Sequence, residues 1–355
     1  MIKKSHKFIK LALLINLFAA LFFVYSCSFN IPSDSKVYIV GIGLNYNSKY
    51  RLSGPINDVS EFCTYYKYIL DKKGVSNEVF YMLHMIDPQT GNDYTNWNSE
   101  YAPSKANIKR LLNSFAYGSE AHKKITQKDL LVIYYSGHGN ESTSIDEEES
   151  GAMCLMSYEG QTEPELYTHK ELTEDLKKIE GTVVVISDSC FSGHLAGEVS
   201  DLGSEIYKGN AYNDFGKKGG YSMNFGTLKL VSGIHVLSAS QACDVSYELS
   251  ESDCFNGESH GVFTGFMLQA MGLTHSDNVF GEVPFFNAQT NGKTHSSLGK
   301  TLKVNGTPLS DDKIKNMKLT LNDLYQNGKT YSLFGSYAYQ KAVRNNGPCD
   351  IILIW

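Results

Sequence analysis

The hydrophobic residues of this chain gather in short runs that are separated by longer amphipathic stretches. Six runs are rich in Val, Ile and Tyr and show little alternation of apolar and polar residues: 37–40, 79–83, 130–135, 183–186, 234–237 and 351–354. Unbroken apolar runs of this length are typical of strands that are covered on both faces, as in a parallel sheet. The pattern therefore predicts a mostly parallel sheet with a layer on each side.

Four stretches carry apolar residues at helical spacing: 55–72, 105–117, 168–179 and 261–272. The third begins at Thr168, and Glu171 follows three positions later, which is the arrangement of a capping box. Strands that alternate with helices indicate an α/β fold with helices on both faces of the sheet. We expect a three-layer αβα sandwich formed by one domain, residues 36–355, with long polar loops at 196–230 and 274–318.

The N-terminus reads as a targeting segment. Four lysines precede an apolar stretch, residues 11–24, that is interrupted only by Asn16 and is short for a membrane span. The following Val24-Tyr25-Ser26-Cys27 resembles the bacterial lipobox, which implies removal of residues 1–26 and lipidation of Cys27. Residues 27–35 would then tether an exported envelope lipoprotein to a membrane. The alternative is an ordinary secretion signal with an incidental cysteine.

Charge and cysteine content narrow the function classes. The net charge of −6 and the scattered lysines give no basic patch, so we expect no nucleic-acid partner. Seven cysteines are present and none of them forms a C-x-x-C pair, so neither a zinc site nor a disulfide framework is indicated. A single bridge between Cys243 and Cys254 stays open for an exported protein. The 23 tyrosines are assigned to packing.

Two strand ends carry the candidate chemistry. Run 130–135 leads into Ser136-Gly137-His138-Gly139, and run 183–186 leads into Ser187-Asp188-Ser189-Cys190-Phe191-Ser192-Gly193. Parallel strands deliver their carboxyl ends to one edge of the sheet, where binding clefts form. His138 is therefore expected to meet Cys190 there and to act as its general base. The N–H groups of Gly139 and Cys190 are candidates for an oxyanion hole.

These two motifs resemble the caspase-like cysteine peptidases, in particular the metacaspase and bacterial caspase-domain branch. The 52 residues between His138 and Cys190 agree with the spacing noted for caspases. The likeness extends over about 37–272, through Leu52-Ser53-Gly54-Pro55-Ile56-Asn57-Asp58, Leu237-Ser238-Ala239-Ser240 and Gly261-Val262-Phe263-Thr264. It implies a caspase-like sandwich and a cysteine endopeptidase that acts on peptides or proteins. The Gln-Ala-Cys-Arg-Gly motif of true caspases is absent from the sequence.

The resemblance also implies a specificity pocket for the residue before the cleaved bond (P1). Residues that match Asp58, Ser136 and Asp188 line the pocket for a basic P1 side chain in metacaspases. A carboxylate in a partly dry pocket pairs well with Arg or Lys, at about 1.5–3 kcal/mol for each charge-assisted bond. We therefore expect cleavage after Arg or Lys. For Asp58 the alternative is a residue that complements a helix dipole.

Several alternatives stay open at this level. No metal or cofactor is required by the dyad, although the acidic run at 146–149 could bind Ca²⁺ as an activator or could be a solvated loop. Lys217-Lys218 is a candidate for self-cleavage. The chain could also be a catalytically silent caspase-like module that binds peptides or proteins at a membrane. An asparaginyl- or gingipain-like peptidase would share the dyad and differ in its pocket.

Overall fold

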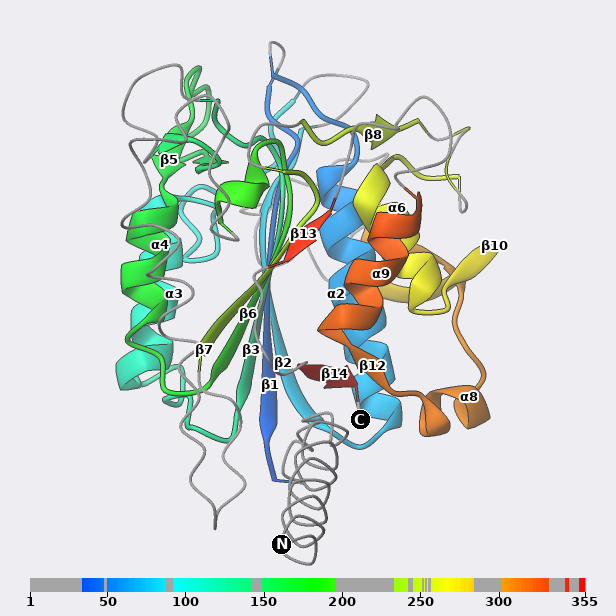
Figure 1. The fold of residues 1–355 in the computed structure, drawn as a ribbon. Helices are drawn as coiled ribbons and strands as arrows, with labels where there is room; N and C mark the ends of the chain where they lie inside the picture. The colour runs from blue at the N-terminus through cyan, green and yellow to red at the C-terminus, as the bar shows by residue number, and fades with distance from the viewer. Residues whose placement is uncertain are drawn as a thin grey trace, which may run out of the picture.

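A computed structural model of the chain shows a twisted sheet between two layers of helices (Figure 1). The structure describes residues 34–47, 50–86, 92–141, 149–195, 233–241, 245–250, 252, 254, 257–283, 302–331, 342–344 and 351–354. The predicted signal peptide, the lipidation site Cys27, the loop 196–230 with Lys217-Lys218, and Cys243 lie outside these residues.

The central sheet has the strand order β13-β7-β6-β3-β1-β2 within the described residues. Five of its strands run parallel, namely β1 (Lys36–Leu44), β2 (Ser76–His84), β3 (Leu130–Ser136), β6 (Thr182–Asp188) and β7 (Gly233–Ser238). The short β13 (Val343–Arg344) pairs antiparallel with β7 at one edge. The α/β fold class and the five parallel runs predicted from the sequence are thus confirmed.

Successive residues of the central strands pack alternately in two separate hydrophobic cores. In β1, Val37 and Ile39 pack in one hydrophobic cluster, whereas Tyr38 and Val40 pack in the other. Because side chains alternate across a strand, both faces of these strands are buried, which explains why their sequences show no polar alternation.

The helices cover the two faces of the sheet as separate groups (Figure 1). One face carries α3 (Lys105–Tyr117) and α4 (His169–Leu176), and the other carries α2 (Pro55–Lys72), α6 (Val262–Ala270) and α9 (Leu321–Tyr331). The capping box predicted at Thr168 is present, with its side chain bonded to the Glu171 amide. Pro55 lies in the first turn of α2, where it lacks only an N–H that a helix leaves unused.

Two expectations from the sequence are wrong. The run 351–354 forms β14 (Ile352–Ile354), which pairs antiparallel with β12 (Leu319–Thr320) outside the central sheet. The stretch 274–318 is not simply a loop, because β10 (Thr274–Val283) and β11 (Leu302–Thr307) pair antiparallel and α8 (Asp311–Asn316) follows. Residues 284–301 lie outside the described part.

Short strand pairs lie beyond the ends of the main strands. β4 (Met153–Leu155) pairs with β5 (Glu165–Tyr167), and β8 (Glu248–Leu249) pairs with β9 (His260–Gly261). β8 lies on the side of the molecule where β3 and β6 end (Figure 1). Among the residues that the structure describes, no helix has the length and apolar character needed to cross a membrane.

Candidate active site

The two predicted motifs meet at the carboxyl edge of the sheet. β3 and β6 are neighbours in parallel register, with Ser136 opposite Asp188, so His138 and Cys190 each follow this pair by two residues. The loops touch through their backbones, because a Cβ atom at Gly139 would overlap the carbonyl oxygen of Cys190. Glycine at 139 is therefore required for this close approach.

One nitrogen of the His138 ring has a defined partner. Nε2 lies 2.6 Å from the carbonyl oxygen of Tyr50, and a carbonyl can only accept, so Nε2 carries the proton in the neutral ring. Nδ1 is then the basic nitrogen. Burial lowers the pKa of His138, and the bond to Tyr50 raises it by a smaller amount, so the imidazole is neutral near pH 7.

Two buried tyrosine hydroxyls hold the His138 peptide unit from both sides. The Tyr46 hydroxyl accepts the His138 N–H at 2.9 Å and donates to the Cys154 carbonyl at 2.7 Å. The Tyr135 hydroxyl donates to the His138 carbonyl at 2.6 Å. The Tyr46 ring also packs on the imidazole, with 4.7 Å between ring centroids. These tyrosines therefore position His138, a role that the assignment of tyrosines to packing overlooked.

The Cys190 thiol is partly buried and lies against a neighbouring backbone. The Ser246 N–H points at the sulfur with an N–S distance of 3.4 Å, and the sulfur lies 3.7 Å from the Ser246 carbonyl oxygen. Burial raises the pKa of Cys190, the Ser246 N–H lowers it, and the charge of Asp188 raises it again. The resting group is therefore a thiol, and it needs a base to become a nucleophile.

The imidazole and the thiol lie on two loops that are in backbone contact, but they are not hydrogen-bonded to each other. Within the described residues, no hydrogen bond links the His138 ring to the Cys190 sulfur. Phe191, directly after Cys190, has φ 56° and ψ 14°, in the left-handed region that a bulky residue rarely adopts. Such backbone strain persists only where surrounding contacts enforce it, and it clusters at functional sites.

The geometry of Gly139 suits one of the two expected oxyanion donors. Gly139 forms an antiparallel bridge with Met153, and the flanking bonds run from the Cys154 amide to His138 (3.2 Å) and from the Asn140 amide to Ala152 (3.0 Å). In such a non-bonded pair the central N–H points away from the partner strand. The Gly139 N–H is thus not used by that strand.

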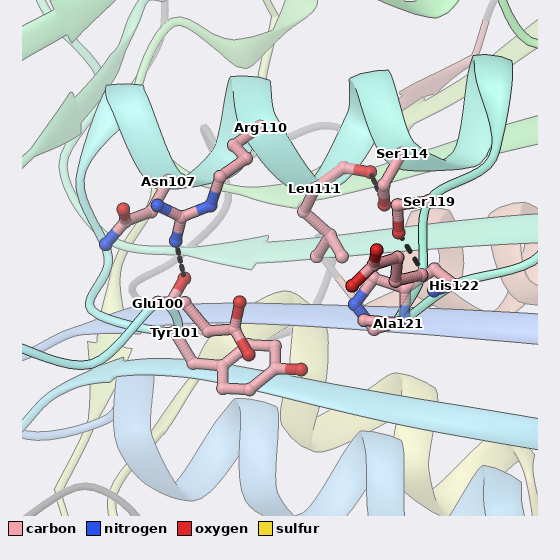
Figure 2. A pocket seen from close by; sticks show the side chains of 10 residues that line it. Glu100, Tyr101, Asn107, Arg110, Leu111, Ser114, Ser119, Ala121 and His122 are labelled. Carbon is pink, nitrogen blue, oxygen red and sulfur yellow. Dashed lines mark hydrogen bonds between the residues drawn. The ribbon is translucent and has the colours of Figure 1, made fainter.

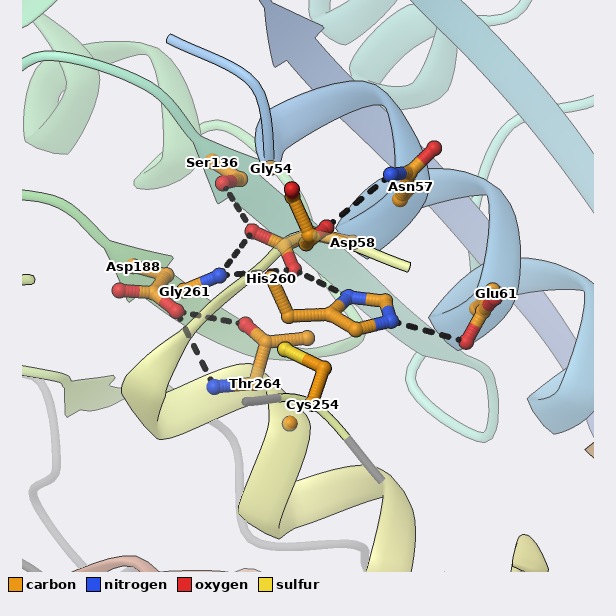
Figure 3. A network of polar contacts seen from close by, with 12 residues as sticks. Gly54, Asn57, Asp58, Glu61, Ser136, Asp188, Cys254, His260, Gly261 and Thr264 are labelled. Carbon is orange, nitrogen blue, oxygen red and sulfur yellow. Dashed lines mark hydrogen bonds and ion pairs between the residues drawn. The ribbon is translucent and has the colours of Figure 1, made fainter. Parts of the chain in front are cut away.

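Asp58 and Ser136, two of the three predicted pocket residues, are in direct contact (Figure 3). The Ser136 hydroxyl donates to Asp58 Oδ2 at 2.7 Å, and Gly261 N–H donates to both carboxylate oxygens, at 3.1 and 3.2 Å. Nδ1 of His260 lies 2.8 Å from Asp58 Oδ1. The Asp58 side chain is fully buried, and internal donors occupy both of its oxygens.

Asp188 links the predicted pocket residues to Cys190, the predicted nucleophile. Ser246 Oγ donates to its Oδ1 at 2.6 Å, and Thr264 donates to its Oδ2 through N–H at 3.1 Å and Oγ1 at 2.6 Å. A Cβ atom at Gly261 would overlap this carboxylate. Burial, together with the charge of Asp58, raises the pKa of Asp188 to about 6.

The positively charged residue among these carboxylates, His260, was not predicted from the sequence. His260 is buried, with Nδ1 facing Asp58 and Nε2 3.2 Å from Glu61 Oε2 (Figure 3). Carboxylates only accept, so both ring nitrogens carry protons. Burial lowers the pKa of His260, but the bonds and charges of Asp58 and Glu61 overcome this and raise it to about 10. The neighbouring Gly261–Thr264 was singled out in the sequence, but His260 was not.

A further carboxylate, that of Glu248, borders this cluster. Glu248 accepts the Gly54 N–H at 2.8 Å and the Ser53 N–H at 3.3 Å, which ties β8 to the start of α2. It pairs across the β8–β9 ladder with Gly261. Burial raises the pKa of Glu248, and the charge of Asp188 adds a smaller increase.

The remaining site predictions have these outcomes. Cys63, Cys154 and Cys190 are free thiols, whereas Cys243, the other half of the bridge left open with Cys254, lies outside the described residues. Of the acidic run 146–149, only Glu149 is described, and the described residues contain no cluster of three or more His, Cys, Asp or Glu side chains that could hold a metal. A separate cavity of about 260 Å³ lies along α3, and its lining, which includes Arg110 and His122, contains none of the predicted site residues (Figure 2).

Comparison with known proteins shows what this part of the chain is similar to. Residues 39–198, a little under half of the chain, match the family model described as metacaspase, peptidase C14 domain. No curated protein matches the sequence. Among solved structures, caspase-1 from Spodoptera frugiperda aligns with a TM-score of 0.41 and 9% identity, over 93% of this chain and 94% of its own. A likeness of that size carries no weight for function. The family match spans Asp58, His138 and Cys190, so the stretch 39–198 is similar to the peptidase domain of metacaspases, which are caspase-like cysteine peptidases.

Proposed function

We propose that this protein is a cysteine endopeptidase in which Cys190 is the nucleophile and His138 is its general base. The observation that carries the proposal is the meeting of the two motifs: Gly139 and Cys190 are in backbone contact at the edge of the sheet, inside a segment that matches a peptidase family. The Tyr50 carbonyl fixes the proton on Nε2 of His138, which leaves Nδ1 basic.

The proposed reaction proceeds in two stages. Nδ1 accepts the thiol proton while Cys190 Sγ attacks the peptide carbonyl carbon, and the N–H groups of Gly139 and Cys190 stabilise the oxyanion. The imidazolium then gives its proton to the leaving amine, so that the C–N bond breaks and a thioester remains. In the second stage His138 takes a proton from water, the hydroxide adds to the thioester, and Cys190 leaves with the proton returned.

Substrate binding would bring the thiol and imidazole into hydrogen-bond contact. They are not hydrogen-bonded in this structure, and catalytic hydrogen bonds often tighten only when substrate is bound. The neutral thiol and neutral imidazole are the protonation states that this mechanism needs at rest.

We further propose that the pocket accepts Arg or Lys at P1. Asp58, Asp188, Glu61 and Glu248 gather four carboxyl groups around one internal cation, His260, so the cluster has an excess of negative charge when it is ionised. Ser246, which contacts both Cys190 and Asp188, lies between the nucleophile and this cluster. A cationic side chain near Cys190 would be attracted by that field.

A positional scanning peptide library with purified mature protein, with and without Ca²⁺, tests the assignment. Turnover of Arg or Lys peptides that is abolished in Cys190→Ala supports the peptidase and its specificity. Faster turnover of peptides with Asp at P1 contradicts the basic preference, and a preference for Asn at P1 favours an asparaginyl-type pocket. Dependence on Ca²⁺ would bring the acidic run 146–149 into the mechanism as the site of an activating ion.

The second candidate function is a silent caspase-like module that binds peptides or proteins. The raised pKa of Cys190 and the missing bond to His138 are the observations that favour it. A peptide electrophile with a basic P1 residue separates the two functions: it labels Cys190 in a peptidase and leaves it unlabelled in a silent module.

We also propose the envelope location implied by the N-terminal sequence. Cleavage before Cys27 and acylation of its thiol and new amino group would hold the catalytic domain at a membrane through residues 27–35. Metabolic labelling with a radioactive fatty acid tests this, since label should be incorporated by the natural sequence and lost in Cys27→Ser. Secretion of an unlabelled protein would instead indicate an ordinary signal peptide.

A further inference from the structure

We propose that Ser240 is a positioning residue for Cys190, because its buried hydroxyl bridges the two ends of the turn that carries the thiol. The inference rests on the proposed function, in which Cys190 is the nucleophile. Ser240 is the second residue after β7 and is fully buried, and it is not hydrogen-bonded to the thiol or the imidazole.

The bridge consists of two hydrogen bonds at one oxygen. Ser240 Oγ donates to the carbonyl oxygen of Ser189 at 3.0 Å and accepts the N–H of Ser192 at 3.2 Å. Ser189 and Ser192 are the residues immediately before and after the pair Cys190-Phe191. The hydroxyl therefore holds the residue before the nucleophile and the residue after Phe191 at a fixed separation.

This arrangement differs from an ordinary β-turn in one respect. In a β-turn the carbonyl of the first residue commonly bonds directly to the N–H of the fourth. Here those two groups belong to Ser189 and Ser192, and the Ser240 hydroxyl lies between them. The inserted oxygen keeps the turn wider than a direct bond would and so sets where the Cys190 N–H and thiol point.

Further contacts hold the bridge in place. The Ser240 N–H donates to Ser192 Oγ at 3.3 Å, which makes the contact between the two serines reciprocal. The Ser238 hydroxyl donates to the Ser192 carbonyl at 2.7 Å. β7 delivers both serines to this point, because Ser238 stands opposite Ser187 in the parallel ladder with β6. The left-handed conformation of Phe191 is thus enforced from the neighbouring strand.

Loss of the hydroxyl would leave two buried backbone groups without this partner. The Ser189 carbonyl and the Ser192 N–H can then hydrogen-bond to each other only if the turn becomes narrower. A narrower turn moves Cys190 relative to Gly139, whose backbone it contacts. The spacing of the two proposed oxyanion donors would change, while the acidic cluster beyond Ser246 would keep its contacts. Chemistry should suffer more than substrate binding, because oxyanion donors act chiefly in the transition state.

The test compares steady-state kinetics of the full-length wild-type protein with Ser240→Ala, on the best Arg or Lys peptide. We expect kcat to fall about 10- to 100-fold and KM to change less than about twofold. Alkylation of Cys190 by iodoacetamide, which needs no oxyanion hole, should slow by less than about threefold. Ser240→Thr retains the hydroxyl and should recover most of kcat.

Ser60→Ala is the matched control, since Ser60 is a buried serine of α2 whose hydroxyl has no partner among the described residues. It should keep the wild-type kcat. If Ser240→Ala does not fold, Ser240→Cys decides, because its thiol fills the space of the hydroxyl but is only a weak hydrogen-bond donor and acceptor. Unchanged kcat in a folded Ser240→Ala or Ser240→Cys protein overturns the inference. Absence of turnover in the wild type would instead overturn the proposed function.

Discussion

His260 and Asp58 form a fully buried ion pair, with 2.8 Å between Nδ1 and Oδ1, at the point where β9 meets the first turn of α2. The second ring nitrogen faces Glu61 of the same helix. Breaking one partner of a buried pair leaves an uncompensated charge, which is far more costly than losing an exposed pair. This contact therefore joins the C-terminal part of the fold to the matched peptidase segment.

The first prediction concerns His260→Asn. The folded-state pKa of His260 is about 10, above its ordinary value of 6.5, so its contribution to stability is fully present below about pH 6.5 and is lost as pH rises through about 10. We expect the variant to lose about 3 kcal/mol at pH 6.5 and progressively less toward pH 10. Urea unfolding across this pH range measures the difference.

The exposed pair Lys67–Asp71 on the outside of α2 provides the control. Asp71→Asn should cost less than about 1 kcal/mol because that pair is solvated. Equal losses in Asp71→Asn and His260→Asn, or a loss in His260→Asn that does not vary with pH, would contradict a buried imidazolium.

The second prediction is that the Asp188→Asn variant is more stable and less active than the wild type. The pKa of Asp188 is raised to about 6 from 3.8, so its charged form opposes folding at neutral pH. The difference between these two pKa values corresponds to at most about 3 kcal/mol of destabilisation, at 1.36 kcal/mol per pKa unit. We expect the variant to be about 1–3 kcal/mol more stable at pH 7 and equal to wild type near pH 4.

The same variant should lose turnover of Arg peptides by 10-fold or more, because one carboxylate of the cluster is gone. In the wild type, kcat/KM on Arg peptides should fall as pH drops through about 6, where Asp188 takes up a proton. Asp312→Asn, on the exposed side of α8, is the control and should change neither property. A destabilised Asp188→Asn with unaltered kinetics would assign this residue a purely structural role.

Much of this fold was predictable because its signals are local. The unbroken apolar runs of β1, β3, β6 and β7 indicate burial on both faces, and the residues proposed to be catalytic follow β3 and β6 directly in the sequence. Parallel register then brings His138 and Cys190 to one edge without further information. The run at Ile352–Ile354 was misassigned because an apolar pattern indicates burial and not the identity of the partner strand.

The rest of the site depends on contacts between distant residues. Tyr46 lies in a loop and meets the His138 amide 92 positions away, and no periodicity marks it. His260 is a lone histidine in a polar stretch, and its charge arises only when the fold brings Asp58 against it, 202 positions away. The hairpin β10–β11 was missed because its exposed, irregular strands lack a strong apolar alternation.

The third prediction concerns Tyr46→Phe, which removes the hydroxyl that accepts the His138 N–H and keeps the ring beside the imidazole. We expect a loss of about 1–2 kcal/mol in the free energy of unfolding. We also expect a fall in kcat of about 10-fold, since His138, the proposed general base, loses one of the two hydroxyl groups that hold its backbone. Tyr66→Phe is the matched control, because its buried hydroxyl bonds to the Leu353 carbonyl at 2.6 Å, away from the site. It should lose similar stability and keep its kcat. Equal kcat in both variants would remove Tyr46 from the catalytic apparatus.

The fourth prediction is that Gly139→Ala abolishes turnover. The added methyl group would overlap the Cys190 carbonyl, so one of the two loops must shift and the proposed oxyanion donors must separate. We expect kcat/KM to fall at least about 100-fold, which corresponds to about 2.7 kcal/mol of transition-state stabilisation. Gly265→Ala in α6 is the control, because its new Cβ would meet only His260 Cβ, at 3.7 Å, and alanine favours a helix by about 0.5–1 kcal/mol over glycine. A Gly139→Ala protein that cleaves peptides at the wild-type rate would mean that the two loops separate during catalysis and that the contact between them is no part of the active arrangement.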